Sequence, residues 1–165
     1  MLKTQRIVIN TSPLIALVAA LDDLKILESL YSEVLVPLEV CKEILTGGGT
    51  NFAVAEFQAA TWLQKSTSLL NISPLLLNSL DLGEASVIQL ALNENIQTVC
   101  IDEAVGRRIA RLSGLSLTGS IGILLKAKQE GYPLSIKEAI KKMLNRNIRL
   151  SQKVIDFALK QAGEN

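Results

Sequence analysis

The sequence predicts an α/β fold of three layers, α/β/α, in which helices cover both faces of a short, mainly parallel central sheet. Strand-like and helix-like segments alternate along the chain, which is the pattern of a parallel sheet with crossover helices. The 165-residue chain is 48% hydrophobic but only 4% aromatic, so aliphatic side chains must do the packing, as in strands buried on both faces. The length suits a single domain spanning residues 1–165.

The first half of the chain is predicted to contain two short apolar strands and three helices. In chain order, the strands are Ile7–Ile9 and Glu33–Val36, and the helices begin near Ser12, Asp22 and Pro37. Ser12 is a suitable N-cap for the first helix, with Pro13 in its first position. Gly47–Gly49 is expected to stop the third helix. Residues 51–60 are weakly helical.

The second half begins with an ambiguous stretch from Trp62 to Pro74, which we interpret as an irregular strand at the sheet edge. Beyond it, helices and strands alternate clearly. In order, these are a helix from Asp81 to Leu92, a strand at Thr98–Ile101, a helix at Glu103–Leu112 ended by Gly114, a strand at Leu115–Leu117, and helices at about 119–130, 135–144 and 152–162, the last capped by Ser151.

Four oxygen-bearing side chains form the candidate site. Asn10 and Asp102 each follow a predicted strand, while Glu43 and Glu84 lie in helical segments that otherwise face the core. Parallel strands bring their carboxyl ends to one edge, where ligands bind, and oxygen-only clusters suit Mg²⁺ or Mn²⁺. We therefore predict that these four side chains converge. Glu39, one turn before Glu43, is the alternative inward residue on its helix.

Each of these four positions also has an interpretation without a functional site, and for Glu43 it is an exposed glutamate with no particular partner. Asn10 and Asp102 follow strands and precede helices, so each could simply cap the next helix. Asp81 and Glu84 have the spacing of a capping box, with Asp81 as the N-cap and Glu84 three residues later. The argument for a site therefore rests on the joint pattern rather than on any single residue.

The composition excludes several chemistries. The chain has no histidine, so it has no Ser–His–Asp triad and no Cys–His pair, and proton transfer near neutral pH must use carboxylates, Lys, Tyr or metal-bound water. Cys41 and Cys100 fall in apolar patterns and are expected to be buried thiols rather than a disulfide or a zinc site. The segment Gly47–Thr50 lacks the lysine of a P-loop.

Charge is divided unevenly along the chain. Residues 1–103 carry 5 Lys and Arg against 12 Asp and Glu, whereas residues 104–165 carry 12 against 4. Such a division suggests an acidic site beside a basic surface for a polyanion, although solvated helix faces would give the same counts. Arg107, Arg108 and Arg111 share a broad helix face just after Asp102 and are candidates for phosphate contacts.

No apolar run approaches the ~20 residues that a membrane span requires. The polar residues of Asn10–Pro13 interrupt the N-terminal apolar region, which argues against a secretion signal. We therefore expect a cytoplasmic protein that has no membrane partner.

Several segments, taken in order, carry a resemblance to a known family. They are Ile7–Ile15, Val36-Pro37 followed by Glu43, Leu82–Ala85 running on to Leu92, and Val99–Glu103. Their order and spacing resemble PIN domains, in which the first strand ends in Asp-Thr-Ser. Downstream, Gly106–Ala110, Leu117–Gly122 and Arg149–Ser151 resemble a VapC-like prokaryotic branch of uncharacterised PIN-like proteins, a domain of unknown function. The resemblance covers nearly the whole chain.

The resemblance implies a metal-dependent endoribonuclease in which carboxylates hold one or two Mg²⁺ or Mn²⁺ ions. Carried over to this sequence, Asp102 and Glu84 would be the main metal ligands, Glu43 would complete the site or orient water, and Asn10 would be a neutral ligand. Many such proteins are toxins that pair with a small antitoxin, and dimers are common. The implied partners are therefore RNA, a small antitoxin and a second copy of the chain.

One position departs from the family pattern. Asn10 stands where PIN nucleases usually carry Asp, and an amide oxygen brings no negative charge to a hard cation. Either the site works with the three carboxylates Glu43, Glu84 and Asp102, or activity is weak or lost. The alternative function is therefore a catalytically silent PIN-fold module that binds nucleic acid or a partner protein.

Overall fold

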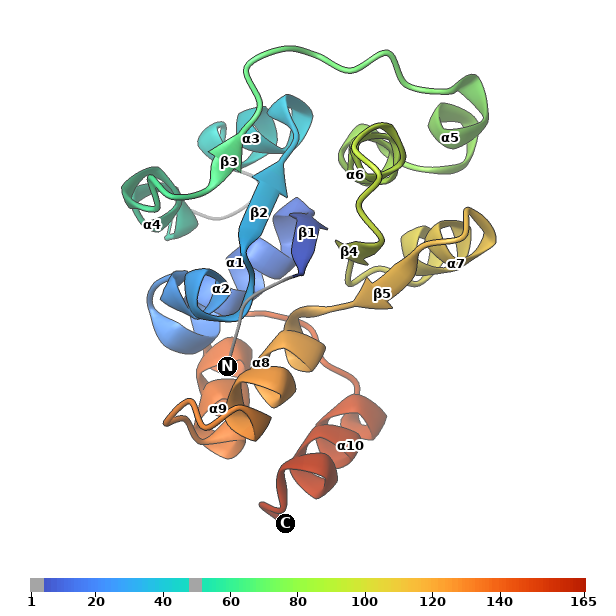
Figure 1. Cartoon of the computed structure of the whole chain (residues 1–165). Coiled ribbons are helices and arrows are strands. Elements are labelled where there is room, and N and C mark those ends of the chain that lie inside the picture. The colour runs from blue at the N-terminus through green and yellow to red at the C-terminus, as the bar shows by residue number, and fades with distance from the viewer. Residues whose placement is uncertain (1–4, 48–51) are drawn as a thin grey trace.

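The computed structural model describes residues 5–47 and 52–165 (Figure 1). Within these ranges, five strands form one sheet in which every neighbouring pair runs parallel. The strands are β1 Arg6–Ile9, β2 Glu33–Val36, β3 Gln64–Lys65, β4 Thr98–Cys100 and β5 Ser116–Thr118, in the order β3-β2-β1-β4-β5. The predicted parallel sheet is confirmed. Its order places β1 directly beside β4, about 90 residues later in the chain, with Ile9 opposite Cys100.

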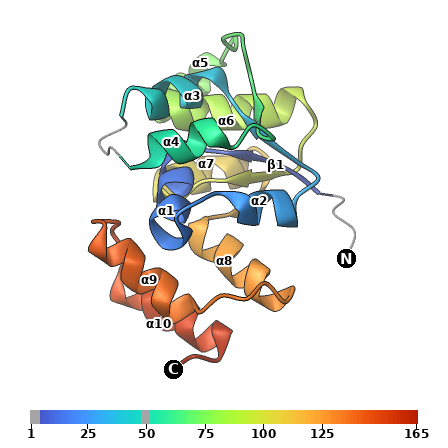
Figure 2. The same ribbon diagram turned by 90° about the vertical axis from the view of Figure 1, so that its left-hand side faces the viewer.

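Helices cover the sheet on both sides, so that the fold has three layers. They are α1 Thr11–Leu21, α2 Lys25–Leu30, α3 Leu38–Leu45, α4 Ala53–Ala59, α5 Pro74–Ser79, α6 Leu82–Asn93, α7 Ala104–Leu112, α8 Ser120–Gln129, α9 Ile136–Asn145 and α10 Gln152–Ala162. Helix α6 packs on β1 and β4 and against α3, while α1 packs against α8 and α9. Figures 1 and 2 both place α3 and α6 at one end of the molecule and α8, α9 and α10 at the other.

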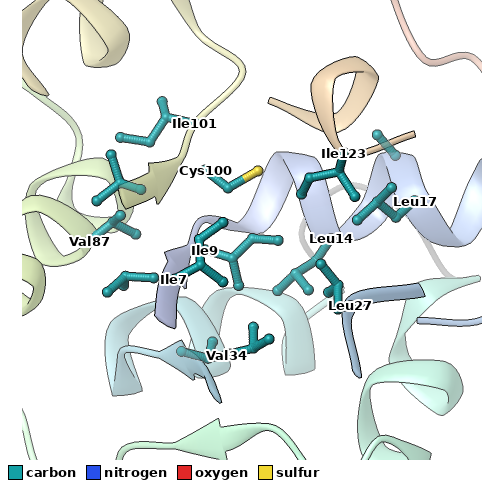
Figure 3. Packing of buried hydrophobic residues seen from close by; sticks show 14 of the residues in the cluster. Ile7, Ile9, Leu14, Leu17, Leu27, Val34, Val87, Cys100, Ile101 and Ile123 are labelled. Atoms are coloured by element: carbon teal, nitrogen blue, oxygen red, sulfur yellow. The ribbon is translucent and has the colours of Figure 1, made fainter. Parts of the chain in front are cut away.

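The core is aliphatic, as the composition predicts. Ile7 and Ile9 of β1 are fully buried, and Figure 3 shows them in one cluster with Val87, Cys100 and Leu14. Cys41 and Cys100 are both free and buried, which confirms their prediction as core thiols. Burying such a set of Ile, Leu and Val side chains contributes about 1.5–3 kcal/mol for each, so this core stabilises the packing of the helices on the sheet.

Two predicted helix starts are wrong. Helix α1 begins at Thr11 with Asn10 as its N-cap, so Ser12 and Pro13 already lie inside the first turn. Asp22 does not open the second helix, which begins at Lys25. Instead Asp22 ends α1 in a left-handed conformation (φ 67°), donates its backbone N–H to the Val18 carbonyl, and forms ion pairs with Lys142 and Arg146.

The caps of two later helices are confirmed. Asp81 accepts a hydrogen bond from the backbone N–H of Glu84 (2.9 Å), and Ser151 accepts one from Val154 (3.1 Å). The ambiguous stretch contains the two-residue strand β3 at the sheet edge, as predicted, but the short helix α5 was not foreseen. Of the predicted stop at Gly47–Gly49, Gly47 is left-handed (φ 98°) just after α3, and the other two glycines lie outside the described residues.

Across the described part of the chain, no helix combines the length and apolar character needed to cross a membrane.

Candidate functional site

Two of the predicted site residues lie at the same edge of the sheet. Asn10 directly follows β1 and Asp102 lies two residues beyond β4, and the Asn10 backbone N–H donates to the Cys100 carbonyl at 3.1 Å. Because β1 and β4 are adjacent and parallel, their carboxyl ends lie side by side, and the backbone leaves the sheet there after each strand. The predicted location of the site therefore follows from the observed strand order.

Asn10 and Glu43 share one small space beside the first turn of α6. A methyl group placed on Gly83 would lie 3.0 Å from Glu43 Oε1 and 3.1 Å from Asn10 Oδ1, with Asp81 Oδ1 at 3.6 Å. Thr11 donates its hydroxyl to Glu43 Oε1. The Asn10 side chain is only 4% exposed, and its Oδ1 has no hydrogen-bond partner. A buried carbonyl oxygen without a partner is costly, so Asn10 Oδ1 is available to a ligand.

Like Asn10, Glu84 is a buried residue with a side-chain oxygen that no hydrogen bond satisfies. It is 5% exposed, and its Oε2 has no hydrogen-bond partner. This oxygen points at α7, where a methyl group on Gly106 would lie 2.6 Å away. Burial, together with the negative charges of Asp81 and Glu103, raises the pKa of Glu84 to about 7. The structural interpretation of Glu84 is confirmed, because the residue occupies the third position after the Asp81 N-cap and donates its backbone N–H to Asp81 Oδ1.

Asp102 is held at the N-terminus of α8. Its Oδ1 accepts from the Ser120 backbone N–H at 2.8 Å, and its Oδ2 accepts from the Ser120 hydroxyl at 2.9 Å. Asp102 as a residue is exposed, but desolvation of its carboxyl group by the surrounding protein raises its pKa, and this outweighs the two Ser120 hydrogen bonds and the nearby Arg107 charge, which lower the pKa. Asp102 thus caps α8 rather than α7, the helix that directly follows it, because the N-cap of α7 is Glu103.

The four predicted residues are therefore brought to one edge but not into mutual contact. Asn10 and Glu43 face one another, whereas the acidic neighbours that raise the pKa of Glu84 are Asp81 and Glu103 rather than Asp102. Among residues 5–47 and 52–165, no three Asp, Glu, Cys or His side chains are gathered closely enough to hold a metal ion.

Glu39, the alternative inward-facing residue on α3, makes a structural contact rather than joining the candidate site. Glu39 is buried, and its Oε2 accepts from the Leu70 backbone N–H at 2.9 Å, which ties the long connection after β3 to α3. Glu43, one turn later, is exposed and reaches Thr11. The two glutamates thus divide between a structural contact and the candidate site.

The three arginines of α7 do not act as one group. Arg107 is partly buried, and its Nη1 donates to the Ile101 carbonyl at 2.8 Å and the Thr118 carbonyl at 3.2 Å. Arg108 and Arg111 are exposed. Arg107 therefore ties β4 to β5 beside Asp102, while the other two remain free to meet solvent or a ligand.

Four residues near the site were not assigned a part in it by the pattern alone. Thr11 and Ser120 donate hydroxyls to Glu43 and Asp102, and the charges of Asp81 and Glu103 act on Glu84. The sequence position of each pair of residues could have indicated its role. The hydroxyl residues stand in the first turn of a helix that starts at the strand ends, and the acidic residues are within three positions of a predicted ligand.

The donor set fits a hard divalent cation in its chemistry. All the candidate donors are oxygens, and two of them are buried atoms without partners. Burial, followed by the negative charges of Asp81 and Glu103, raises the pKa of Glu84. The carboxylates of Glu43, Asp81 and Asp102 are each held by a protein hydrogen-bond donor, and an ion bound between them would compete with those donors.

Replacing Gly106 with Ala is expected to destabilise the protein by about 1–3 kcal/mol, the usual cost of overpacking. The added methyl group would lie 2.6 Å from Glu84 Oε2 and 2.9 Å from Cγ2 of the fully buried Ile101. Urea unfolding measures the change. A variant more stable than the parent, as the higher helix propensity of Ala alone would give, would show that α7 and Glu84 are not closely packed.

Comparison with known proteins agrees with this architecture. A family model described as DUF3368, PIN domain, matches residues 6–164. None of the curated protein sequences matches the chain. The match spans all five strands and ends beyond the last helix. PIN domains are in general nuclease-type folds that use divalent metals. With its parallel sheet and its acidic residues at the carboxyl edge, this chain belongs to the PIN-domain family.

Proposed function

We propose that this chain is a metal-dependent endoribonuclease of the VapC-like toxin type, which cleaves RNA phosphodiester bonds with carboxylate-held Mg²⁺ or Mn²⁺. Four buried side-chain oxygens of the described residues have no hydrogen-bond partner, those of Asn10, Glu39, Glu56 and Glu84. The observation that carries the proposal is that two of them, Asn10 Oδ1 and Glu84 Oε2, lie at the carboxyl edge of the sheet. Leaving such atoms uncompensated costs stability, and natural proteins keep them chiefly where a ligand satisfies them.

Glu84, Asp102 and Glu43 would hold the ion, with Asn10 as a neutral ligand. A bound Mg²⁺ or Mn²⁺ supplies charge stabilisation at the phosphate and acidifies its bound water. Without an ion, Glu84 has a pKa of about 7, so a cation that binds near neutral pH would displace the proton from this carboxyl group. Ser120 fixes the orientation of Asp102, and Thr11 does the same for Glu43.

The substrate and partners follow from the family and from the charges. RNA is a polyanion that the acidic edge repels until an ion is bound, while the basic residues after position 103 attract it. Arg107, Arg108 and Arg111 remain the proposed phosphate contacts. A small antitoxin, a homodimer and a cytoplasmic location complete the proposal.

The second candidate function is a silent module that binds nucleic acid or protein. Asn10 favours it, because the amide removes one negative charge from the place where the family usually has a carboxylate. The dispersed carboxylates favour it too, since in the described residues they do not already form a closed cluster. Against it stands the raised pKa of Glu84, a buried carboxyl group that has no compensating partner for one of its oxygens.

Purified protein is expected to cleave RNA in the presence of Mn²⁺ or Mg²⁺ and to stop when EDTA is added. Titration calorimetry should show Mn²⁺ binding that Asp102→Asn weakens by about 10-fold or more. Replacing the exposed Glu138 with Gln, on α9, is the matched control and should leave both readouts unchanged. If the parent neither binds Mn²⁺ nor cleaves RNA, the silent module is the correct function.

A further inference from the structure

A groove extends from Asp102 along the C-terminal helices. Its cavity, of about 450 Å³, lies between the N-terminal half of α8, the connection from α9 to α10, and one face of α10. Asp102 and Arg107 line it at one end and Val154 and Phe157 of α10 at the other. A second cavity, of about 340 Å³, shares Asp102, Ile148 and Arg149 with the first and continues toward Ser12 of α1. Cavities of this size accommodate small ligands or single groups of larger ones.

Arg149 stands where the two cavities meet. It is exposed and makes no ion pair or side-chain hydrogen bond with any described residue. Arg107, in contrast, is already engaged by two backbone carbonyls. Of the described residues that line the larger cavity, Asp102 is the only carboxylate, so the guanidinium groups of Arg107 and Arg149 leave this cavity with net positive charge. An uncommitted guanidinium beside the carboxylate proposed as a metal ligand is well placed for a phosphate oxygen.

Phe157 supplies a second kind of contact. The chain has six aromatic residues, and all lie within the described ranges. Five are buried or packed partly into the core, whereas Phe157 is 55% exposed and lines the groove. A lone exposed aromatic needs no explanation. An exposed aromatic ring in one groove with a free arginine is, however, the combination that proteins use for single-stranded nucleic acid, where bases stack on rings and phosphates meet cations.

We propose that this groove is a subsite for a single-stranded segment of RNA, in which a base stacks on Phe157 and a neighbouring phosphate contacts Arg149. The inference rests on the proposed function, because it takes the acidic edge at Asp102 as the place where the strand is cut. A duplex cannot use the site, since its bases are stacked on one another and do not offer a free face. The apolar walls would also suit a protein segment, but the free Arg149 and the shared wall with Asp102 favour a polyanion.

The test measures binding of the full chain to a short single-stranded oligouridylate that carries one 2-aminopurine, in EDTA so that no cleavage occurs. Fluorescence anisotropy gives the affinity, and 2-aminopurine emission reports stacking. Phe157→Leu keeps an apolar side chain without an aromatic face and is expected to weaken binding by about 5- to 150-fold and to abolish the emission change. Arg149→Ala should make the dependence of RNA affinity on salt less steep, by about 0.7 log units of affinity per log unit of salt concentration.

Two comparisons make the result specific. Lys25→Ala removes one positive charge from an exposed residue that lines a different cavity, with Trp62, and should leave affinity close to the parent's. A blunt RNA duplex should bind more weakly than the single strand and be insensitive to Phe157→Leu. Unchanged thermal unfolding of each variant shows that the fold is intact.

The outcomes separate this inference from the proposed function. Binding through Phe157 and Arg149 without cleavage in Mn²⁺ would support the subsite and refute the nuclease. If the parent cleaves RNA in Mn²⁺, and Phe157→Leu and Arg149→Ala cleave and bind RNA as well as the parent does, the nuclease is supported and the subsite is overturned. If Phe157→Leu binds RNA with the affinity of the parent, the proposed stacking contact is wrong, and a protein segment becomes the alternative occupant of the groove.

Discussion

Replacing Glu84 with Gln is expected to reduce Mn²⁺-dependent cleavage by about 100-fold or more, since loss of residues that only support metal ligands already costs about 10- to 100-fold. Gln has nearly the same shape but cannot carry the negative charge that a divalent ion needs from its ligands. Metal binding by calorimetry and RNA cleavage by gel assay give the two readouts. Glu94→Gln, at the exposed C-terminal end of the same helix, is the matched control.

The same substitution should change how stability depends on pH in the metal-free protein. The pKa of Glu84 is about 7 in the folded protein, against 4.5 for an ordinary glutamate. Between these values the unfolded chain loses the proton while the folded protein keeps it, so the free energy of unfolding falls as pH rises. The stabilising contribution is complete below about pH 4.5 and is lost above about pH 7.

Glu84→Gln cannot ionise and should therefore be more stable than the parent above neutral pH, by about 1–3 kcal/mol, and similar to it in acid. Urea unfolding in EDTA at about pH 5 and about pH 8 measures the difference. Added Mn²⁺ should reverse the order at high pH, because the ion stabilises the parent alone. A variant less stable than the parent at both pH values would mean that Glu84 is well compensated as a carboxylate.

Replacing Asn10 with Asp is expected to tighten Mn²⁺ binding by about tenfold or more, because an added attraction of only ~1.4 kcal/mol already gives a factor of ten. The new carboxylate would lie beside Glu43 in the small space next to Gly83 and would restore the charge that PIN nucleases usually carry. Cleavage should rise with affinity. Calorimetry with Mn²⁺ and an RNA cleavage assay check both expectations.

Without metal, the Asn10→Asp protein should be less stable than the parent, because the added charge is buried. The side chain at position 10 is almost fully buried, and Glu43 would repel it. Thermal unfolding in EDTA is expected at a lower temperature than in the parent, and Mn²⁺ should raise it by a larger amount. The double variant Asn10→Asp, Glu43→Gln keeps the parent's charge and should lose most of the gain in affinity. Unchanged or weaker Mn²⁺ binding in the single variant would remove Asn10 from the metal site.

The strands and the later helices were predictable because their signals are local. Short continuous apolar runs placed β1, β2 and β4 within one residue of their observed ends, and Asp81 and Ser151 cap the helices that they were expected to cap. The start of α1 was missed because Asn10, Ser12 and Pro13 all satisfy N-terminal preferences, and the choice among them depends on where the backbone leaves β1. Asp22 was misplaced because its partners, Lys142 and Arg146, are 120 or more residues away in sequence.

The sequence by itself determined the α/β class, the aliphatic core and the edge at which Asn10 and Asp102 would lie, since parallel strands share their carboxyl ends. Only the tertiary structure decided how the acidic side chains group. The first turn of α6 brings Gly83 against Asn10 and Glu43, α7 leaves room for Glu84 only because residue 106 is glycine, and the N-terminus of α8 takes Asp102 through Ser120. Those contacts depend on how whole helices pack against the sheet, and that packing is set by many buried side chains at once rather than by the spacing of any motif.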